Sequence, residues 1–201
     1  RRRAVLAEQT LYRTQPDVSL DGKRFVYSST SGSADQYNNL YVQPTVGDQP
    51  YKLTFFQHDA FNPSWSPQGE WIAFTSNTGR LPQLELLETY GGTRRSIRVR
   101  QRKWRRPMGS LRVSVQAGGG PTAARVHLRA ADGKFYAPDD AYARISSVGD
   151  PVFHTSGVST VQVPTGEVEL TLVKGFEFQP VRRGSGSRKT KKPQGASLWR
   201  G

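Results

Sequence analysis

The sequence predicts an all-β protein, and three observations support this fold class. The chain of 201 residues carries 20 Gly and 13 Pro among short apolar alternations, which favours strands and turns. Residues 62–77 read as a strand, a tight turn and a second strand, because Pro67 presets φ at a central turn position and Gly69 accepts a positive φ. The same pattern occurs 47 residues upstream, where Pro16 occupies the position equivalent to Pro63.

The two copies indicate an internal repeat. Ser19 aligns with Ser66, and we expect Val18 and Trp65 to occupy equivalent buried positions. A period of about 40 to 50 residues with about four strands per unit is typical of a β-propeller blade. Two blades do not close a ring, so further blades lie in a longer parent or sheet edges stay open. The expected strands are 17–20, 24–29, 39–43 and 51–54 in the first blade, then 62–66, 71–76, 83–87 and 94–100 in the second.

Residues 66–74, preceded by 51–54 and followed by 84–92, resemble the TolB-type propeller repeat. Gln68 stands where the family pattern has Asp, and Asp21 keeps that Asp in the first copy. The resemblance covers about residues 11–106. It implies a partial TolB-like β-propeller of two blades and leaves the function open.

After residue 110 the alternation changes to that of a small antiparallel β-sandwich. Expected strands are 111–115, 125–129, 159–163 and 167–173, with a turn at 164–166. This order resembles the carboxypeptidase regulatory-like, transthyretin-like domains. Residues 104–109, 130–142 and 173–178 are also similar to the region before the catalytic domain of CehA/McbA-type metal-dependent hydrolases, whose PHP-type domain binds metal. We therefore expect propeller blades at 1–106, a sandwich at 107–180 and a basic, disordered tail at 181–201.

The chain is strongly basic, with 29 Lys and Arg against 16 Asp and Glu and a net charge of +13. Basic residues are dense at 94–106, where Ile97 and Val99 alternate with Arg98 and Arg100. Such alternation indicates a strand with one buried and one solvated face, and arginines protect a strand edge from aggregation. The alternative is a nucleic-acid groove in which Trp104 stacks a base.

Motifs for catalysis are scarce. The three histidines do not have the spacing of a metal site, there is no cysteine, and neither a Gly-x-Ser-x-Gly elbow nor a phosphate-binding glycine loop is present. We therefore expect no catalytic, cofactor-binding or metal-binding residue in this segment. The residues we expect to contact a partner, because they lie on loops or on the basic strand, are His58, Asp59, Arg98, Arg100 and Trp104.

These observations predict a non-catalytic scaffold that binds a protein or peptide, or a downstream hydrolase domain of the same parent. Metal-dependent hydrolysis by the segment itself and non-specific nucleic-acid binding are the alternatives. No run of 18 apolar residues could span a membrane, and no apolar segment follows Arg1–Arg3 as in a signal peptide. The family resemblance implies an exported, periplasmic setting.

Overall fold

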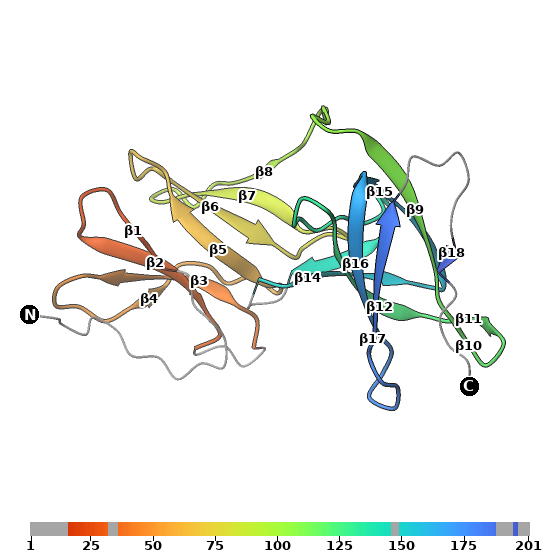
Figure 1. Ribbon diagram of the computed structural model, residues 1–201. Coiled ribbons are helices and arrows are strands. Elements are labelled where there is room, and N and C mark those ends of the chain that lie inside the picture. The colour runs from red at the N-terminus through yellow and green to blue at the C-terminus, as the bar shows by residue number, and fades with distance from the viewer. Residues whose placement is uncertain (1–15, 32–35, 146–148, 188–194, 197–201) are drawn as a thin grey trace, which may run out of the picture. The chain divides into compact units, whose positions relative to one another are not determined.

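The computed structural model describes residues 16–31, 36–145, 149–187 and 195–196. These residues form eighteen strands and no helix, which confirms the predicted all-β class (Figure 1). The chain divides into two compact units. Unit 1 comprises Arg1–Arg100 and Ile145–Gly149, and unit 2 comprises Gln101–Arg144 and Asp150–Gly201.

Unit 1 contains two four-stranded antiparallel sheets, called blade 1 and blade 2, in which each strand pairs with the next along the chain. This order is the one expected for consecutive blades. Blade 1 consists of β1 (Asp17–Val18), β2 (Arg24–Ser29), β3 (Asn39–Pro44) and β4 (Tyr51–Lys52), and blade 2 of β5 (Ala60–Trp65), β6 (Trp71–Ser76), β7 (Gln83–Glu88) and β8 (Arg94–Ile97).

The turn between the first two strands has the same construction in both blades. The amide of Gly69 donates to the carbonyl of Ser66 at 2.9 Å, and that of Gly22 donates to Ser19 at 2.8 Å. Both glycines have positive φ, 75° and 67°. In each copy the serine hydroxyl also accepts a hydrogen bond of 3.0 Å from the amide that starts the next strand. The predicted turn chemistry is confirmed.

The core of unit 1 lies between the two blades. Side chains of β2 and β3 pack against side chains of β5, β6 and β7 in one hydrophobic cluster. Asp17 joins the blades at one end, since its Oδ2 accepts hydrogen bonds from Ser64 Oγ at 2.9 Å and from the Trp65 amide at 2.7 Å. The buried members of the cluster are Val26, Leu40, Val42, Ala60, Trp65, Ile72, Phe74 and Leu87.

The expectation that Val18 is buried is wrong, although its equivalence to Trp65 is right. Val18 pairs with Phe25 as Trp65 pairs with Ile72, so the registers agree. However, Val18 is 56% exposed and Trp65 only 9%. The reason is that Trp65 faces blade 1, whereas Val18 lies on the opposite face of blade 1, which no other described blade covers.

Unit 2 consists of a five-stranded sheet, a three-stranded sheet and a short hairpin. The sheet orders are β13-β14-β12-β16-β17, β15-β9-β18 and β10-β11. In β16, Val168, Leu170 and Leu172 are buried while the residues between them are more exposed. Such alternation buries one face of the sheet. The strands are β9 (Met108–Ser114), β10 (Gln116–Ala117), β11 (Gly120–Pro121), β12 (Ala124–Arg129), β13 (Tyr142–Ile145), β14 (Pro151–Thr155), β15 (Val158–Pro164), β16 (Gly166–Val173), β17 (Val181–Ser187) and β18 (Gly195–Ala196).

The expected disorder from residue 181 is corrected for the start of that segment. Val181–Ser187 form β17, which pairs antiparallel with β16 over its whole length. Pairing of this kind satisfies the backbone groups at the edge of β16 and needs no apolar alternation in the added strand. Residues 188–194 and 197–201 lie outside the described part of the chain.

Candidate functional site

The five residues predicted to contact a partner do not form one site. His58 and Asp59 lie in the loop between β4 and β5, while Arg98 and Arg100 follow β8. Trp104 belongs to unit 2. Their role in binding stays a prediction. The contacts of each residue within its own unit determine which of its groups could still bind a partner.

His58 is fixed by contacts within unit 1. Its ring stacks on Phe56, with centroids 4.8 Å apart. Its Nδ1 lies 3.3 Å from Ser76 Oγ, and its Nε2 lies 3.4 Å from a guanidinium nitrogen of Arg94. Both ring nitrogens therefore face groups of the same unit, and the half-buried ring is better suited to a structural role than to capture of a partner.

Asp59 connects the two blades. Its Oδ1 accepts hydrogen bonds from the amide of Asn38 at 3.0 Å and from Asn38 Nδ2 at 3.1 Å. The Ala60 amide donates to the Asn38 carbonyl at 2.8 Å. Because these bonds occupy one carboxylate oxygen and fix the loop, Asp59 positions the start of β5.

Glu85 is a buried carboxylate that the sequence analysis did not identify. It is fully buried on β7, and its Oε2 lies 2.5 Å from Arg94 Nε of the neighbouring strand β8. The second oxygen accepts from an Arg94 guanidinium nitrogen at 3.3 Å. The same guanidinium lies 4.8 Å from the centroid of the Phe56 ring. A buried carboxylate needs such a partner, so this ion pair holds β8 to the blade.

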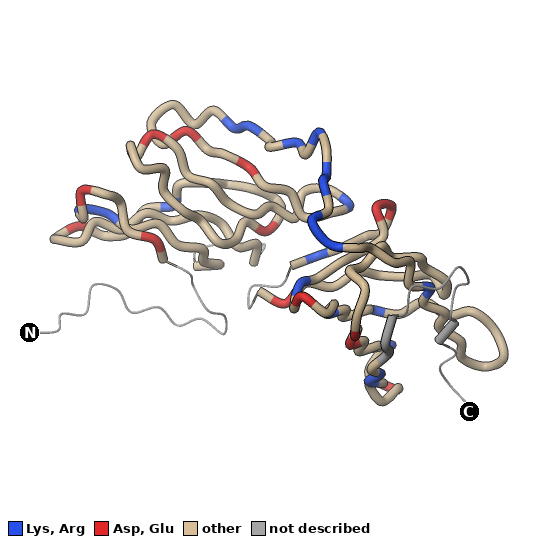
Figure 2. The backbone as a smooth tube through the Cα atoms, turned by 45° about the horizontal axis from the view of Figure 1, so that its top comes forward, with Lys and Arg blue, Asp and Glu red and all other residues tan. Residues whose placement is uncertain are grey.

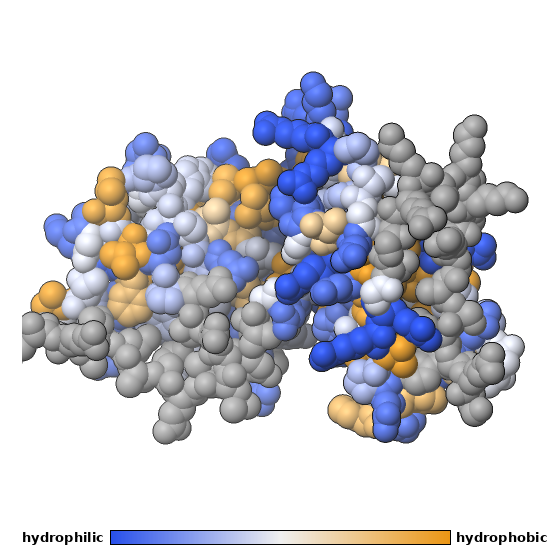
Figure 3. Space-filling view, in the orientation of Figure 1, coloured by the Kyte–Doolittle hydropathy of each residue, from blue (hydrophilic) through white to orange (hydrophobic). Residues whose placement is uncertain are grey.

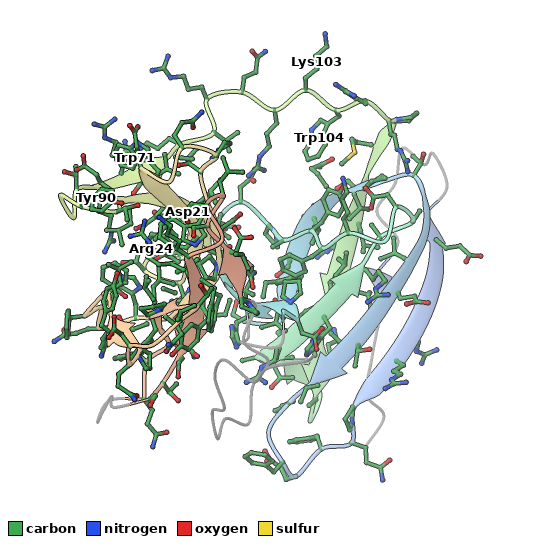
Figure 4. The ribbon with its side chains drawn as sticks, turned by 90° about the vertical axis from the view of Figure 1, so that its left-hand side faces the viewer. Asp21, Arg24, Trp71, Tyr90, Lys103 and Trp104 are labelled. Atoms are coloured by element: carbon green, nitrogen blue, oxygen red, sulfur yellow. The ribbon has the colours of Figure 1, made fainter. Side chains whose placement is uncertain are left out.

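Aromatic and cationic side chains also meet near the turns of the two blades. The Arg24 guanidinium lies 5.5 Å from the Trp65 ring centroid and 5.8 Å from that of Tyr90. It also donates a 3.0 Å hydrogen bond to the Tyr90 hydroxyl. Arg95 lies 4.7 Å from the ring centroid of Trp71. Figure 4 labels Arg24, Tyr90 and Trp71 among the side chains of unit 1. These cations are therefore engaged with rings of unit 1.

Blade 2 has an apolar face that points away from blade 1, and we call it the outer face. Its apolar residues form the cross-strand pairs Ala73–Leu86 and Leu84–Ile97, and Thr75 and Arg95 lie on the same face. Leu84 is 47% exposed and Ile97 44%. Since Val99 is also exposed, the prediction that this basic strand buries one face is wrong. β8 ends at Ile97 and is the edge of its sheet.

The basic residues after β8 are solvent-exposed. Lys and Arg positions follow one another along the segment that leads from β8 to β9 (Figure 2). In the space-filling view, hydrophilic side chains gather over this segment (Figure 3). Arg98 and Arg100 are exposed and have no hydrogen-bond or ion-pair partner among the described residues. This edge therefore offers positive charge to a partner.

Trp104 lies at the start of unit 2 against a tyrosine. Its ring centroid is 6.0 Å from that of Tyr136, and its side chain is 47% exposed. The Tyr136 hydroxyl donates to Asp132 at 3.0 Å. Nearby, Arg102 forms an ion pair of 3.0 Å with Asp139. One face of the Trp104 ring is therefore in contact with unit 2, and Arg102 already has a partner.

Unit 2 also carries a hollow of about 380 Å³ on the polar face of its larger sheet. His127 and Thr171 are paired across β12 and β16, as are Arg129 and Glu169. Burial, and then the nearby charge of Arg125, lower the pKa of His127. The hollow is lined by His127, Leu128, Arg129, Gly133, Phe135, Asp150, Pro151, Glu169 and Thr171.

Within the described ranges, no three His, Cys, Asp or Glu side chains come together in a group able to hold a metal ion. Metal-assisted hydrolysis needs about three protein ligands around one ion. None of the described residues form a helix long and apolar enough to cross a membrane.

No family model and no curated protein matches the chain. Two solved structures are similar, the putative TolB from Agrobacterium tumefaciens and TolB from Acinetobacter baumannii. The first is 17% identical, with 91% of this chain and 54% of the other covered, and the second is 15% identical, with 88% and 44% covered. Both have a TM-score of 0.39, which carries no inference about function. The chain thus spans about half the length of these proteins.

Proposed function

We propose that this chain is a non-catalytic scaffold that binds a partner protein through the outer face of blade 2. The observation that carries the proposal is the equivalence between this face and a buried face of blade 1. Ala73 pairs with Leu86 as Val26 pairs with Val42. In blade 1 both valines are fully buried, because blade 2 packs on them.

The equivalence extends to the neighbouring strands. Leu84 pairs with Thr75 as Leu40 pairs with Ser28. Leu40 is fully buried, whereas Leu84 is 47% exposed. The outer face of blade 2 thus repeats a face that is buried by sheet packing in blade 1. In blade 2 this face has exposed apolar surface, on which another protein can pack. Burial of such surface favours association by about 25 cal/mol per Å² before the costs of binding.

The polar contacts that join blade 1 to blade 2 are not repeated on the outer face. Asp17 joins the blades through two hydrogen bonds, and its equivalent in blade 2 is Ser64. Asn38 also joins them, and its equivalent is Pro82. A partner on the outer face would therefore be held mainly by apolar contact, which suits reversible binding.

The test is an affinity capture from an extract of the source cells. Wild-type chain should retain a defined set of proteins, and a variant carrying Leu84→Glu with Ile97→Glu should lose them. Val46→Glu is the matched control, since Val46 is 72% exposed in a turn away from the outer face. Equal retention by the outer-face variant and the control would contradict the proposal.

We also propose that the scaffold is an exported accessory region of a larger metal-dependent hydrolase. This finer proposal rests on the sequence resemblance of residues 104–109, 130–142 and 173–178 to such regions. Recovery of the flanking genomic sequence should show an export signal and a histidine-rich metal site. Elemental analysis should find no stoichiometric zinc, manganese or iron in the present chain, and metal that is lost on mutation of His58, His127 or His154 would favour hydrolysis by the segment itself.

Weak polyanion binding is a second candidate, favoured by the exposed Trp104 beside a basic segment. Such binding would be independent of sequence, because the basic residues accompany no module that reads bases. Binding of a single-stranded oligonucleotide that survives about 200 mM salt would raise this candidate above the scaffold.

A further inference from the structure

We infer that the free edge of β8 binds an extended acidic peptide, which adds to blade 2 as a fifth strand. The inference rests on the proposed protein-binding role and names the class of partner. β8 is the last strand in the order β5-β6-β7-β8, and no other described strand pairs with it. All four residues of β8 are exposed. A strand edge of this kind offers unpaired N–H and C=O groups to an added strand.

The backbone groups that point outward can be identified. The Glu88 amide donates to the Thr93 carbonyl at 2.8 Å, so these two residues form a hydrogen-bonded pair of the β7–β8 ladder. Hydrogen-bonded pairs occur at every second position of an antiparallel ladder. Arg95 and Ile97 therefore bond to β7. The N–H and C=O of Ser96 point away from the sheet and are available to an added strand.

The side chains along the edge select the partner. Ile97 lies on the outer-face side together with Arg95 and is 44% exposed, and Val99, beyond the end of β8, is 68% exposed. Arg98 and Arg100 alternate with Ile97 and Val99 in the sequence, are exposed, and have no partner among the described residues. Residues of an added strand alternate in the same way. The matching peptide therefore carries apolar residues at every second position and Asp or Glu between them.

The same charges disfavour two other occupants. Edge-to-edge pairing of two copies would bring the arginines of β8 close to one another, and like charges that face each other across a strand pair are destabilising. A nucleic acid would meet the arginines but has no peptide groups to pair with Ser96. The alternation of exposed apolar and basic residues thus favours an acidic peptide over both.

The probe is a capped peptide of about seven residues in which glutamate and valine alternate. Binding to the full chain is measured by isothermal titration calorimetry, and the amide of Ser96 is followed by hydrogen exchange. We expect saturable binding and slower exchange at Ser96. Ser96→Pro removes the outward N–H without touching the ladder to β7, and it should weaken binding about tenfold or more. Ser96→Ala keeps the N–H and should bind as the wild type does.

Three results would overturn the inference. The first is equal binding to Ser96→Pro and Ser96→Ala. The second is equal binding of a peptide of the same composition with its glutamates and valines in separate blocks, because charge alone would then explain the affinity. The third is no binding at about 1 mM peptide. Far-ultraviolet circular dichroism of Ser96→Pro excludes general unfolding as the cause of a loss.

The failure of this inference is distinguishable from failure of the proposed function. If the peptide does not bind but Leu84→Glu with Ile97→Glu still loses captured proteins, the outer face binds partners without strand addition. If the peptide binds and the captured set is unaffected by that variant, strand addition occurs and the outer face is not the binding surface.

Discussion

Replacement of Trp65 by alanine should destabilise unit 1 strongly, while the equivalent Val18→Ala should have little effect. Trp65 is 9% exposed and Val18 is 56% exposed, although they hold the same register position in the two blades. A buried aromatic side chain removes about 150 to 250 Å² from water, which corresponds to about 4 to 6 kcal/mol at about 25 cal/mol per Å². Large-to-small truncations of this kind cost about 3 to 5 kcal/mol.

The lower part of that range is expected for Trp65. Its Nε1 is buried without a hydrogen-bond partner among the described residues, so the wild type already carries a penalty of about 1 to 3 kcal/mol that the truncation removes. We therefore expect a loss of about 3 kcal/mol for Trp65→Ala and less than about 0.5 kcal/mol for Val18→Ala.

The assay is native-state hydrogen exchange of the strands of unit 1, because a global denaturation curve would mix the two units. The free energies of opening of β5 and β6 should fall by the stated amount in Trp65→Ala. A change below about 1 kcal/mol, or an equal change in Val18→Ala, would refute the assignment of a shared core between the blades.

Three further predictions concern charge. Arg94→Leu should lower the stability of unit 1 by about 2 to 3 kcal/mol, because it leaves the buried carboxylate of Glu85 unpaired while Arg94 itself is 35% exposed. Native-state hydrogen exchange of β7 should show this loss, and adding Glu85→Leu should restore part of the stability. NMR titration should place the pKa of His127 below its ordinary value, and Arg125→Ser should raise it. Folding favours the neutral ring of His127, so the stability that this residue contributes is present above about pH 6.5 and is lost as the pH falls towards the folded pKa. A melting temperature that does not change with pH in this range would count against the assignment. Oligonucleotide binding should weaken steeply from about 50 to 200 mM salt and be largely removed by deletion of residues 184–201, and binding that survives both would locate the site to the basic residues 94–106.

The local chemistry of unit 1 was predictable from the sequence. The glycines and serines of the two turns require a specific backbone geometry, and the structure has that geometry at both Gly22 and Gly69. β6 spans Trp71–Ser76, as the apolar pattern predicted. Such signals act within a few residues, so they can be recognised without knowledge of the tertiary fold.

Burial was harder to predict, because it depends on which sheet covers a face. Val18 and Ile97 have the apolar character of core residues, and both are exposed. The ion pair of Glu85 with Arg94 was also missed. The sequence contained one signal for this ion pair. Glu85 stands among the leucines of β7, and an arginine follows on the next strand.

The candidate site was only partly accessible from the sequence. Asp59 was identified as a loop residue, but its hydrogen bonds to Asn38 depend on packing between strands 21 residues apart. β17 was missed because its pairing depends on the free edge of β16 rather than on its own side chains. Arg98 and Arg100 were identified by charge, and their exposure is compatible with the predicted role.

The polar residues that connect blade 1 to blade 2 affect how such a chain can be extended by gene duplication. Copying the turn serine, the turn glycine and the apolar positions reproduces a blade with a surface on which another blade can pack. Asp17 and Asn38, however, make the polar joint to the following blade, and the second repeat has Ser64 and Pro82 in their places. A tandem third copy would therefore stack without directional hydrogen bonds. Pro82→Asn would restore the Asn at this position for a third blade, whereas Ser64→Asp would also remove the hydroxyl that donates to Asp17 between the first two blades.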